Sequence, residues 1–229
     1  MRGVWIGIVS LVFSYWFAIV LLKGLSVLPV KMGYRCGAMI GRLTFYLSPR
    51  RRHVAQRNIQ ACFPQITESD QKDLVKQVFV ESGVGLIESS WVWFKQSSKI
   101  VFRVDEESRK NLRDAVARGK GVLLLCPHFT TLEVSAVVIN RIVGRFVITY
   151  RPQESESFDK TICDGRARFG DLVNVRDLRA MVSALRRGRV VWFGPDQDMG
   201  PRGSVFADFF GMPACTVTTP ARLSRSTDC

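Results

Sequence analysis

The sequence predicts an α/β protein: an N-terminal membrane helix, then a mostly parallel sheet flanked by helices. Two observations carry this prediction. Residues 4–22 form a long uncharged apolar run, and from residue 121 onward short apolar runs alternate with helical segments. Such alternation is typical of parallel strands joined by crossover helices.

The composition is that of a basic, folded protein. The chain has 229 residues, of which 47% are hydrophobic, and a net charge of +13 from 33 Lys and Arg against 20 Asp and Glu. This length suits one domain with a small appendage. The positive charge favours polyanionic partners, which include nucleic acid, an anionic membrane face, a phosphorylated lipid or an acidic protein.

The apolar run predicts that residues 1–23 are a transmembrane or membrane-anchoring helix. Residues 4–22 are long enough to cross a hydrocarbon core of roughly 30 Å. Lys23, Lys31 and Arg35 follow the run, so we expect the remainder of the chain on the cytoplasmic side. The alternatives are a signal peptide or a buried core helix, but no good cleavage site follows the run.

Residues 24–100 are predicted to be a helical, basic, membrane-proximal region. Gly33, Gly37 and Gly41 lie four apart, so on a helix over 29–47 they would share one smooth face that permits close approach of another helix or of lipid. A loose turn region is the alternative. The basic segment 48–64 is suited to lipid headgroups, although a solvated helix face would look the same.

Two further helices are predicted before the sheet. Thr67 lies three residues before Asp70 and begins a helix over 66–94, with Ser69 as another possible cap. A shorter helix over 106–119 ends at Gly119.

Residues 101–229 are predicted to form the α/β core. The expected strands are 121–127, 145–150, 171–175 and 189–196, and the expected helices are 130–143, 157–170 and 176–188. The unbroken apolar run of 121–127 is typical of a strand that is buried on both faces. His128, Arg151 and Asp196 each follow the end of a strand. Sites in parallel sheets lie beyond the carboxyl ends of the strands, so these side chains are expected at one edge.

His128 has two interpretations. Fixed at a strand end, with the Glu133 carboxylate accepting a hydrogen bond from one ring nitrogen, it would be a general base for a substrate hydroxyl. Alternatively, Thr130 and Glu133 form a helix-capping box, and His128 is an ordinary surface residue.

Several function classes are disfavoured by missing motifs. The sequence has no GxSxG elbow, no Walker loop and no GxGxxG. Its six cysteines form no CxxC pair and it has only two histidines, so we expect no metal site. Nucleic acid is the weakest of the polyanionic partners, because no recognised binding motif accompanies the basic residues.

Five stretches carry a family resemblance. In chain order they are RRRHVAQRNIQACFP, GLIESSWVWF, GVLLLCPHFTTLE, YRP and VVWFGPDQDMGPRGSVFADFFGMPA. The stretch HFTTLE has the HxxxxD/E form of the glycerolipid acyltransferase superfamily. Taken together, from the apolar run to about residue 223, the chain resembles the bacterial lipid A biosynthesis acyltransferases of the lauroyl or myristoyl type.

The resemblance implies transfer of a fatty acyl group from acyl carrier protein to a hydroxyl of a Kdo-bearing lipid A precursor, without a covalent acyl-enzyme and without a cofactor. It implies that His128 is the general base and Glu133 its orienting partner. Arg166 would hold an anionic group, and Asp196 would orient Arg166 or a substrate hydroxyl. Arg151, Asp198 and Arg202 are further substrate-binding candidates. The implied place of action is the cytoplasmic side of the bacterial inner membrane, beside anionic lipids.

The resemblance weakens at the C-terminus. The residues TTPARLS predict a helix that packs on the sheet, with Pro220 in its first turn, but STDC resembles nothing in the family. We therefore expect the C-terminal part of the fold to be missing. That part would cover one edge of the sheet and part of the acyl groove. Two alternatives stay open: an acyltransferase for another glycolipid or a lysophospholipid, and an inactive membrane protein that binds anionic partners.

Overall fold

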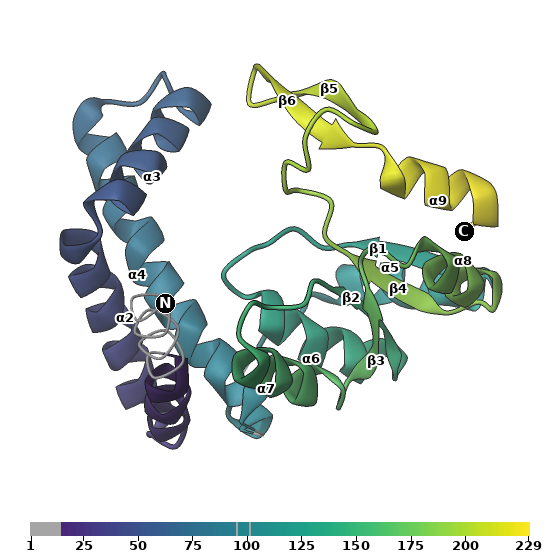
Figure 1. Cartoon of the computed structure of the whole chain (residues 1–229), viewed down its shortest axis with the longest axis horizontal. Helices are drawn as coiled ribbons and strands as arrows, with labels where there is room; N and C mark the ends of the chain where they lie inside the picture. The colour runs from purple at the N-terminus through teal and green to yellow at the C-terminus, as the bar shows by residue number, and fades with distance from the viewer. Residues whose placement is uncertain (1–14, 95, 101) are drawn as a thin grey trace, which may run out of the picture.

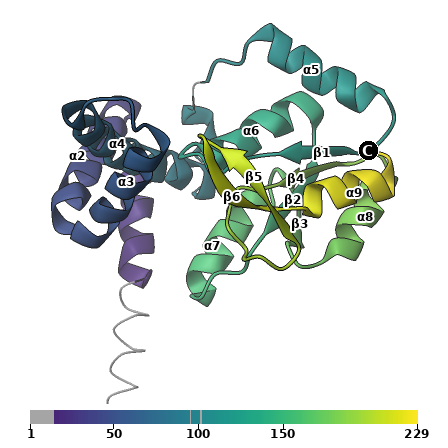
Figure 2. The ribbon, with the colours of Figure 1, turned by 90° about the horizontal axis from the view of Figure 1, so that it is seen from above.

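The computed structural model describes residues 15–229 apart from residues 95 and 101 (Figure 1). Helices α2, α3 and α4 lie on one side of the molecule and the sheet with its helices on the other, as both views show (Figure 2). The lower end of α4 reaches the α/β part and packs against α6 and α7. The long helix α4 therefore joins the two parts.

The N-terminal apolar run is described only in its second half. Residues 4–14 of the predicted membrane helix lie outside the described residues, and the chain is helical over 15–26. Among the helices of the described part, none has both the length and the apolar character needed to cross a membrane.

The next three helices are α2 (Val30–Leu47), α3 (Pro49–Cys62) and α4 (Glu68–Trp93). Thr67 is the N-cap of α4 and accepts a hydrogen bond from the Asp70 N–H at 3.2 Å, as predicted. The glycine face of α2 packs on α4. A Cβ on Gly41 would lie 2.2 Å from the Phe79 carbonyl oxygen, and one on Gly83 would lie 2.2 Å from that of Gly37. The predicted close approach is therefore to another helix.

The sheet has four strands, β1 (Val122–Leu125), β2 (Phe146–Tyr150), β3 (Gly170–Asn174) and β4 (Val190–Phe193). Their order is β1-β4-β2-β3, and every neighbouring pair is parallel. The predicted parallel sheet is confirmed. One detail differs: β1 is an edge strand of half-buried residues with Leu125 51% exposed, so it is not buried on both faces. The strand buried throughout is β4.

Helices cover both faces of this sheet. They are α5 (Glu106–Ala117), α6 (Leu132–Val143), α7 (Glu156–Arg166), α8 (Leu178–Arg186) and α9 (Thr219–Thr227), and a short 3-10 turn, η1 (Ser97–Lys99), precedes them. Gly119 and Gly188 follow α5 and α8 with φ values of +72° and +74°, so the predicted glycine ends are confirmed.

Successive side chains of each strand point to opposite faces of the sheet, and this alternation produces one hydrophobic core on each face. Phe146, Ile148 and Trp192 point to a core shared with α4 and α6. Val147 and Val191 point to the opposite core, with Met181 of α8 and Leu223 of α9. The α6 layer and the α8–α9 layer therefore bury alternate residues of the same strands. Helix α9 begins with Pro220 in its first turn, as predicted.

A hairpin that we did not predict lies between β4 and α9. Strands β5 (Ser204–Phe209) and β6 (Met212–Val217) pair antiparallel. The turn residues Phe210 and Gly211 both have positive φ, 54° and 73°, which is the geometry of a tight two-residue turn. The Phe210 ring lies 5.2 Å from the ring of Phe63 at the end of α3, so the hairpin tip touches the helical part.

Candidate active site

A cavity of about 680 Å³ lies beyond the carboxyl ends of the strands. Each of the loops that follow β1, β2, β3 and β4 contributes to its wall, and the segment from β6 into α9 closes it. The residues that line it are His128, Leu132, Thr149, Tyr150, Arg151, Gln153, Arg166, Val175, Arg176, Leu178, Trp192, Phe193, Gly194, Gln197, Met199, Arg202, Gly203, Val217, Thr219 and Arg222. The edge of the sheet at which we expected the site therefore carries a cavity, and His128 and Arg151 line it.

His128 is held by Asp196 through two hydrogen bonds. The His128 backbone N–H donates to Asp196 Oδ2 at 2.7 Å, and the ring Nδ1 lies 2.7 Å from Oδ1. Burial raises the pKa of Asp196, but the two hydrogen bonds from His128, a backbone hydrogen bond and the charge of His128 together outweigh it, so its pKa is lowered. The carboxylate therefore stays ionised at neutral pH. When Nδ1 donates to it, Nε2 is left as a proton acceptor in the cavity wall.

Two glycines leave room for the chain around His128. A Cβ on Gly194, directly after β4, would lie 2.8 Å from His128 Cε1 and 3.3 Å from Nδ1. A Cβ on Gly85 of α4 would lie 2.5 Å from the carbonyl oxygen of Thr130. Such distances are shorter than van der Waals contact, so neither position accepts a side chain without moving the loop or the imidazole.

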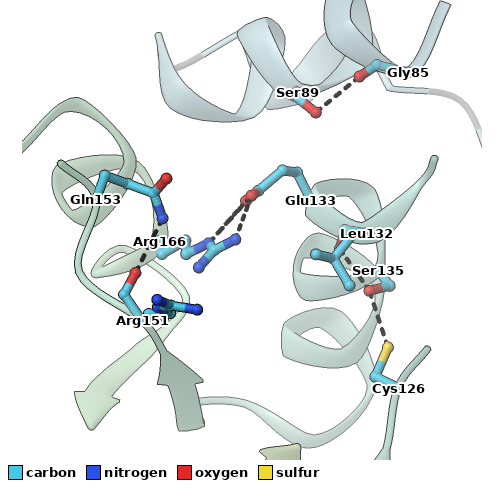
Figure 3. Close-up of polar contacts among 9 residues, drawn as sticks. All are labelled: Gly85, Ser89, Cys126, Leu132, Glu133, Ser135, Arg151, Gln153 and Arg166. Carbon is cyan, nitrogen blue, oxygen red and sulfur yellow. Dashed lines mark hydrogen bonds and ion pairs between the residues drawn. The ribbon is translucent and has the colours of Figure 1, made fainter. Parts of the chain in front are cut away.

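Glu133 and Arg166 form a second pair, between α6 and α7 (Figure 3). Arg166 Nη2 lies 2.5 Å from Glu133 Oε1, and Nε lies 3.2 Å and 3.1 Å from Oε1 and Oε2. Only 6% of the Glu133 side chain and 14% of the Arg166 side chain are exposed. This is a buried ion pair, and Arg166 Nη1 makes no hydrogen bond with any described residue.

The structure thus pairs these four residues differently from the sequence prediction. We expected Glu133 to accept a hydrogen bond from His128, and we expected Asp196 to orient Arg166 or a substrate. Instead Asp196 binds His128 and Glu133 binds Arg166. The physical reason is the strand order: β4 lies beside β1, so Asp196, in the loop after β4, reaches His128 in the loop after β1. The alternative capping box is also absent, because the N-cap of α6 is Thr131 and its side chain caps nothing.

The remaining predicted residues divide into two groups. Arg151 and Arg202 line the cavity, as a substrate-binding role requires. Asp198 does not line it. Its Oδ1 accepts the N–H of Gly200 at 2.7 Å, which is the ordinary role of an aspartate in a turn. The geometry therefore favours Arg151 and Arg202 over Asp198 as binding residues.

Two cavity arginines were missed by the sequence reasoning. Arg176 follows β3 closely, so the strand-end rule that selected His128 and Arg151 applies to it equally. Arg222 lies in the second turn of α9 and reaches the cavity because the β5–β6 hairpin returns the chain to the sheet. No local sequence signal marks Arg222. A neighbour, Tyr150, also lines the cavity, and burial raises its pKa, so its hydroxyl stays protonated.

Comparison with known proteins shows which family the chain resembles. The model of the bacterial lipid A biosynthesis acyltransferase family matches residues 8–229. A lipid A biosynthesis lauroyltransferase of Escherichia coli is 33% identical over 205 residues, which are 89% of this chain and 67% of the relative. A lipid A biosynthesis palmitoleoyltransferase of the same organism is 31% identical over 89% of this chain and 66% of the relative's length. A lipid A biosynthesis acyltransferase of Haemophilus influenzae is 30% identical over 93% of this chain and 68% of the relative's length.

These matches cover nearly the whole of this chain. The chain spans about two thirds of the length of the curated relatives that it matches. A family model over residues 8–229 includes the helical part, the sheet and the cavity. The chain belongs to the bacterial lipid A biosynthesis acyltransferase family.

Proposed function

We propose that this protein transfers a fatty acyl chain from acyl carrier protein to a hydroxyl of a Kdo-bearing lipid A precursor. The observation that carries the proposal is the cavity in which His128, fixed by Asp196, faces cationic and apolar walls together. An acyl chain needs the apolar wall, and a phosphorylated acceptor needs the arginines. The names of the relatives give lipid A biosynthesis as the setting.

The chemistry follows from the hydrogen bonds of His128. Asp196 accepts from Nδ1, so Nε2 takes the proton of the acceptor hydroxyl as its oxygen attacks the thioester carbonyl carbon. The new C–O ester bond forms and the C–S bond breaks. The departing thiolate then takes the proton back from the imidazolium, which Asp196 stabilises meanwhile. No side chain carries the acyl group at any point.

Arg166 has a separate role in this scheme. Glu133 holds its guanidinium by Nε and Nη2, and the remaining nitrogen is available for an anionic oxygen of a substrate. Glu133 thereby acts as a positioning residue for Arg166 rather than for His128. Arg151 and Arg202 contribute further positive charge to the same wall.

We also propose that the protein acts on the cytoplasmic side of the bacterial inner membrane, attached through residues 1–23. The uncharged run at 4–22 supports this proposal, as do the exposed apolar side chains of α2 beside the arginine-rich α3. The exposed residues of α2 include Met39, Leu43, Tyr46 and Leu47, at 61%, 56%, 70% and 70%. An acidic carrier protein would be attracted to a chain of net charge +13.

The direct test is expression in a bacterium whose own late lipid A acyltransferases are deleted. Mass spectrometry of its lipid A should show one added acyl chain with the wild-type protein and none with His128→Ala. Membrane fractionation of the same cells checks that the variant is present and attached. An added chain on a different lipid, or equal acylation by His128→Ala, would contradict the proposal.

A further inference from the structure

The wall of the cavity is cationic. Among the described residues, five arginines line it, namely Arg151, Arg166, Arg176, Arg202 and Arg222, and no Asp or Glu of that part of the chain does. Glu133 neutralises Arg166. The other four side chains form no ion pair with any described residue. All four of these arginines are exposed, so they stand at the open part of the cavity wall with their positive charge available to a ligand. Several like charges around one hollow favour an anionic ligand there.

Arg176 and Arg222 come from a layer of the fold that the proposed chemistry does not use. Arg176 lies two residues before α8 and Arg222 lies within α9. These helices lie side by side, as both views show, and Arg186 of α8 donates to the Ser226 carbonyl of α9 at 3.3 Å (Figures 1 and 2). Glu133 and Arg166 belong to α6 and α7 on the opposite face of the sheet. The cavity therefore has cationic groups on two opposite sides.

The positions of the strands give the scale of the ligand. His128 follows β1 and Arg176 follows β3, and these strands are the two edges of the order β1-β4-β2-β3. Neighbouring strands lie about 4.8 Å apart, so the two strand ends are separated by roughly 14 Å. A ligand that brings a hydroxyl to His128 and an anion to Arg176 bridges strand ends at that separation, less the reach of the two side chains into the shared cavity. A glycolipid headgroup of more than one sugar is large enough.

We propose that Arg176 and Arg222 form a second anion subsite, which binds a phosphate monoester of the acceptor lipid. The inference rests on the proposed function and names the part of the substrate that these residues hold. A phosphate monoester carries about −1.5 to −2 charges and three acceptor oxygens at neutral pH. Two guanidinium groups match it in charge and hydrogen bonding. The phosphodiester of an acyl donor carries a single charge and fits this pair less well.

The test uses matched arginines on the same helices. Arg176→Ala and Arg222→Ala remove cavity residues, whereas Arg179→Ala on α8 and Arg225→Ala on α9 remove arginines that do not line the cavity. Binding of the full chain to a bisphosphorylated lipid A precursor in detergent micelles is measured, and so is binding to the same lipid after phosphatase treatment. We expect each cavity variant to weaken binding of the phosphorylated lipid about tenfold and the controls to change it less than about twofold.

Three outcomes decide between the possibilities. Equal binding of phosphorylated and dephosphorylated lipid by the wild type would overturn the subsite, whether or not the protein transfers acyl chains. If the cavity variants raise KM for the acyl donor and leave binding of the acceptor unchanged, the phosphate belongs to the donor and the assignment is wrong. A selective loss for the phosphorylated acceptor supports it, and because binding is read directly, the result does not depend on turnover.

Discussion

Asp196 binds His128 at both its backbone N–H and its ring Nδ1, each at 2.7 Å, across 68 residues of sequence. The backbone contact fixes the loop and the ring contact fixes the imidazole. One carboxylate therefore sets the position and the tautomer of the proposed base together.

Asp196→Asn should lower acyl transfer at least about 100-fold, because the amide has one acceptor oxygen where the carboxylate uses two, and it carries no charge to stabilise an imidazolium. The fold should persist. Asp105→Asn is the matched control, since Asp105 caps α5 by accepting from the Ser108 N–H and hydroxyl, outside the cavity lining, and asparagine is an equally good cap. Activity of the two variants is compared at equal amounts in membranes. Equal activity would show that Asp196 does not position His128.

The same variant gives a pH test. Because the folded-state pKa of Asp196 is lowered below 3.8, its stabilising contribution is present above pH 3.8 and is lost as the pH falls through the lower, folded value. The wild type should therefore be more stable than Asp196→Asn at neutral pH, and the difference should disappear in acid. Thermal unfolding in detergent from neutral pH downward measures it. A difference that persists unchanged in acid would contradict the assignment.

Gly194→Ala should reduce activity at least tenfold with little loss of stability. The new methyl group would meet His128 Cε1 at 2.8 Å, and the ring, whose side chain is 41% exposed, can swing away from Asp196. The expected signature is a fall in kcat with KM nearly unchanged, because the cavity arginines stay in place. A large drop in Tm with activity retained would mean that the backbone, rather than the ring, had moved.

Removing Arg166 should cost about 3–5 kcal/mol, because Glu133 would keep a buried charge without a partner. Glu133→Gln combined with Arg166→Met should recover part of the loss, with a coupling energy of about 1–3 kcal/mol. Chemical unfolding of both single variants and the double variant measures the coupling. Additive effects would show that the ion pair contributes nothing of its own.

Gly41→Ala should destabilise the helical part by about 1–3 kcal/mol, since its Cβ would lie 2.2 Å from the Phe79 carbonyl oxygen and force α2 and α4 apart. Gly24→Ala is the control: no described residue lies within 4 Å of that Cβ, and alanine favours the helix by about 1 kcal/mol. Opposite shifts in Tm are expected. If both variants behave alike, helix packing does not depend on this contact.

Tyr34→Phe should affect stability mainly at high pH. Burial, and then the charge of Glu88 and a 3.1 Å hydrogen bond to it, raise the pKa of Tyr34 to about 12. Because the folded-state pKa is above the unfolded value of 10.0, protonated Tyr34 contributes stability that is fully present below pH 10. This contribution is lost as the pH rises through about 12. The wild-type advantage, about 1 kcal/mol after solvent screening, should shrink over this range. An advantage that does not change with pH would contradict the link to Tyr34.

Sequence patterns predicted the parallel sheet and its flanking helices because each strand is a short apolar run with a clear boundary. They also placed His128, Arg151 and Asp196 at one edge, since strand ends are readable from the sequence. The partner of each side chain was not readable. Whether Asp196 meets His128 or Arg166 depends on the order β1-β4-β2-β3, which no local pattern encodes.

The β5–β6 hairpin escaped prediction for a different reason. Its turn places Phe210, rather than a residue suited to positive φ, beside Gly211. Strand β5 is largely exposed and β6 is at most half-buried, so neither shows a clear alternation of buried and exposed residues. The contact with Phe63 and the return to the sheet are tertiary effects. Arg222 was missed as a consequence.

The strand order also determines when, during synthesis of the chain, Asp196 and His128 can come together. Among the described strands, β1 bonds only to β4, which leaves the ribosome 68 residues later, as the pairing of Val122 with Val190 shows. Until then β2 and β3 can pair, but both edges of β1 are unpaired. Insertion of β4 closes the sheet and delivers Asp196 to His128 in the same event. A nascent chain therefore gains its proposed catalytic pair only when its sheet is complete.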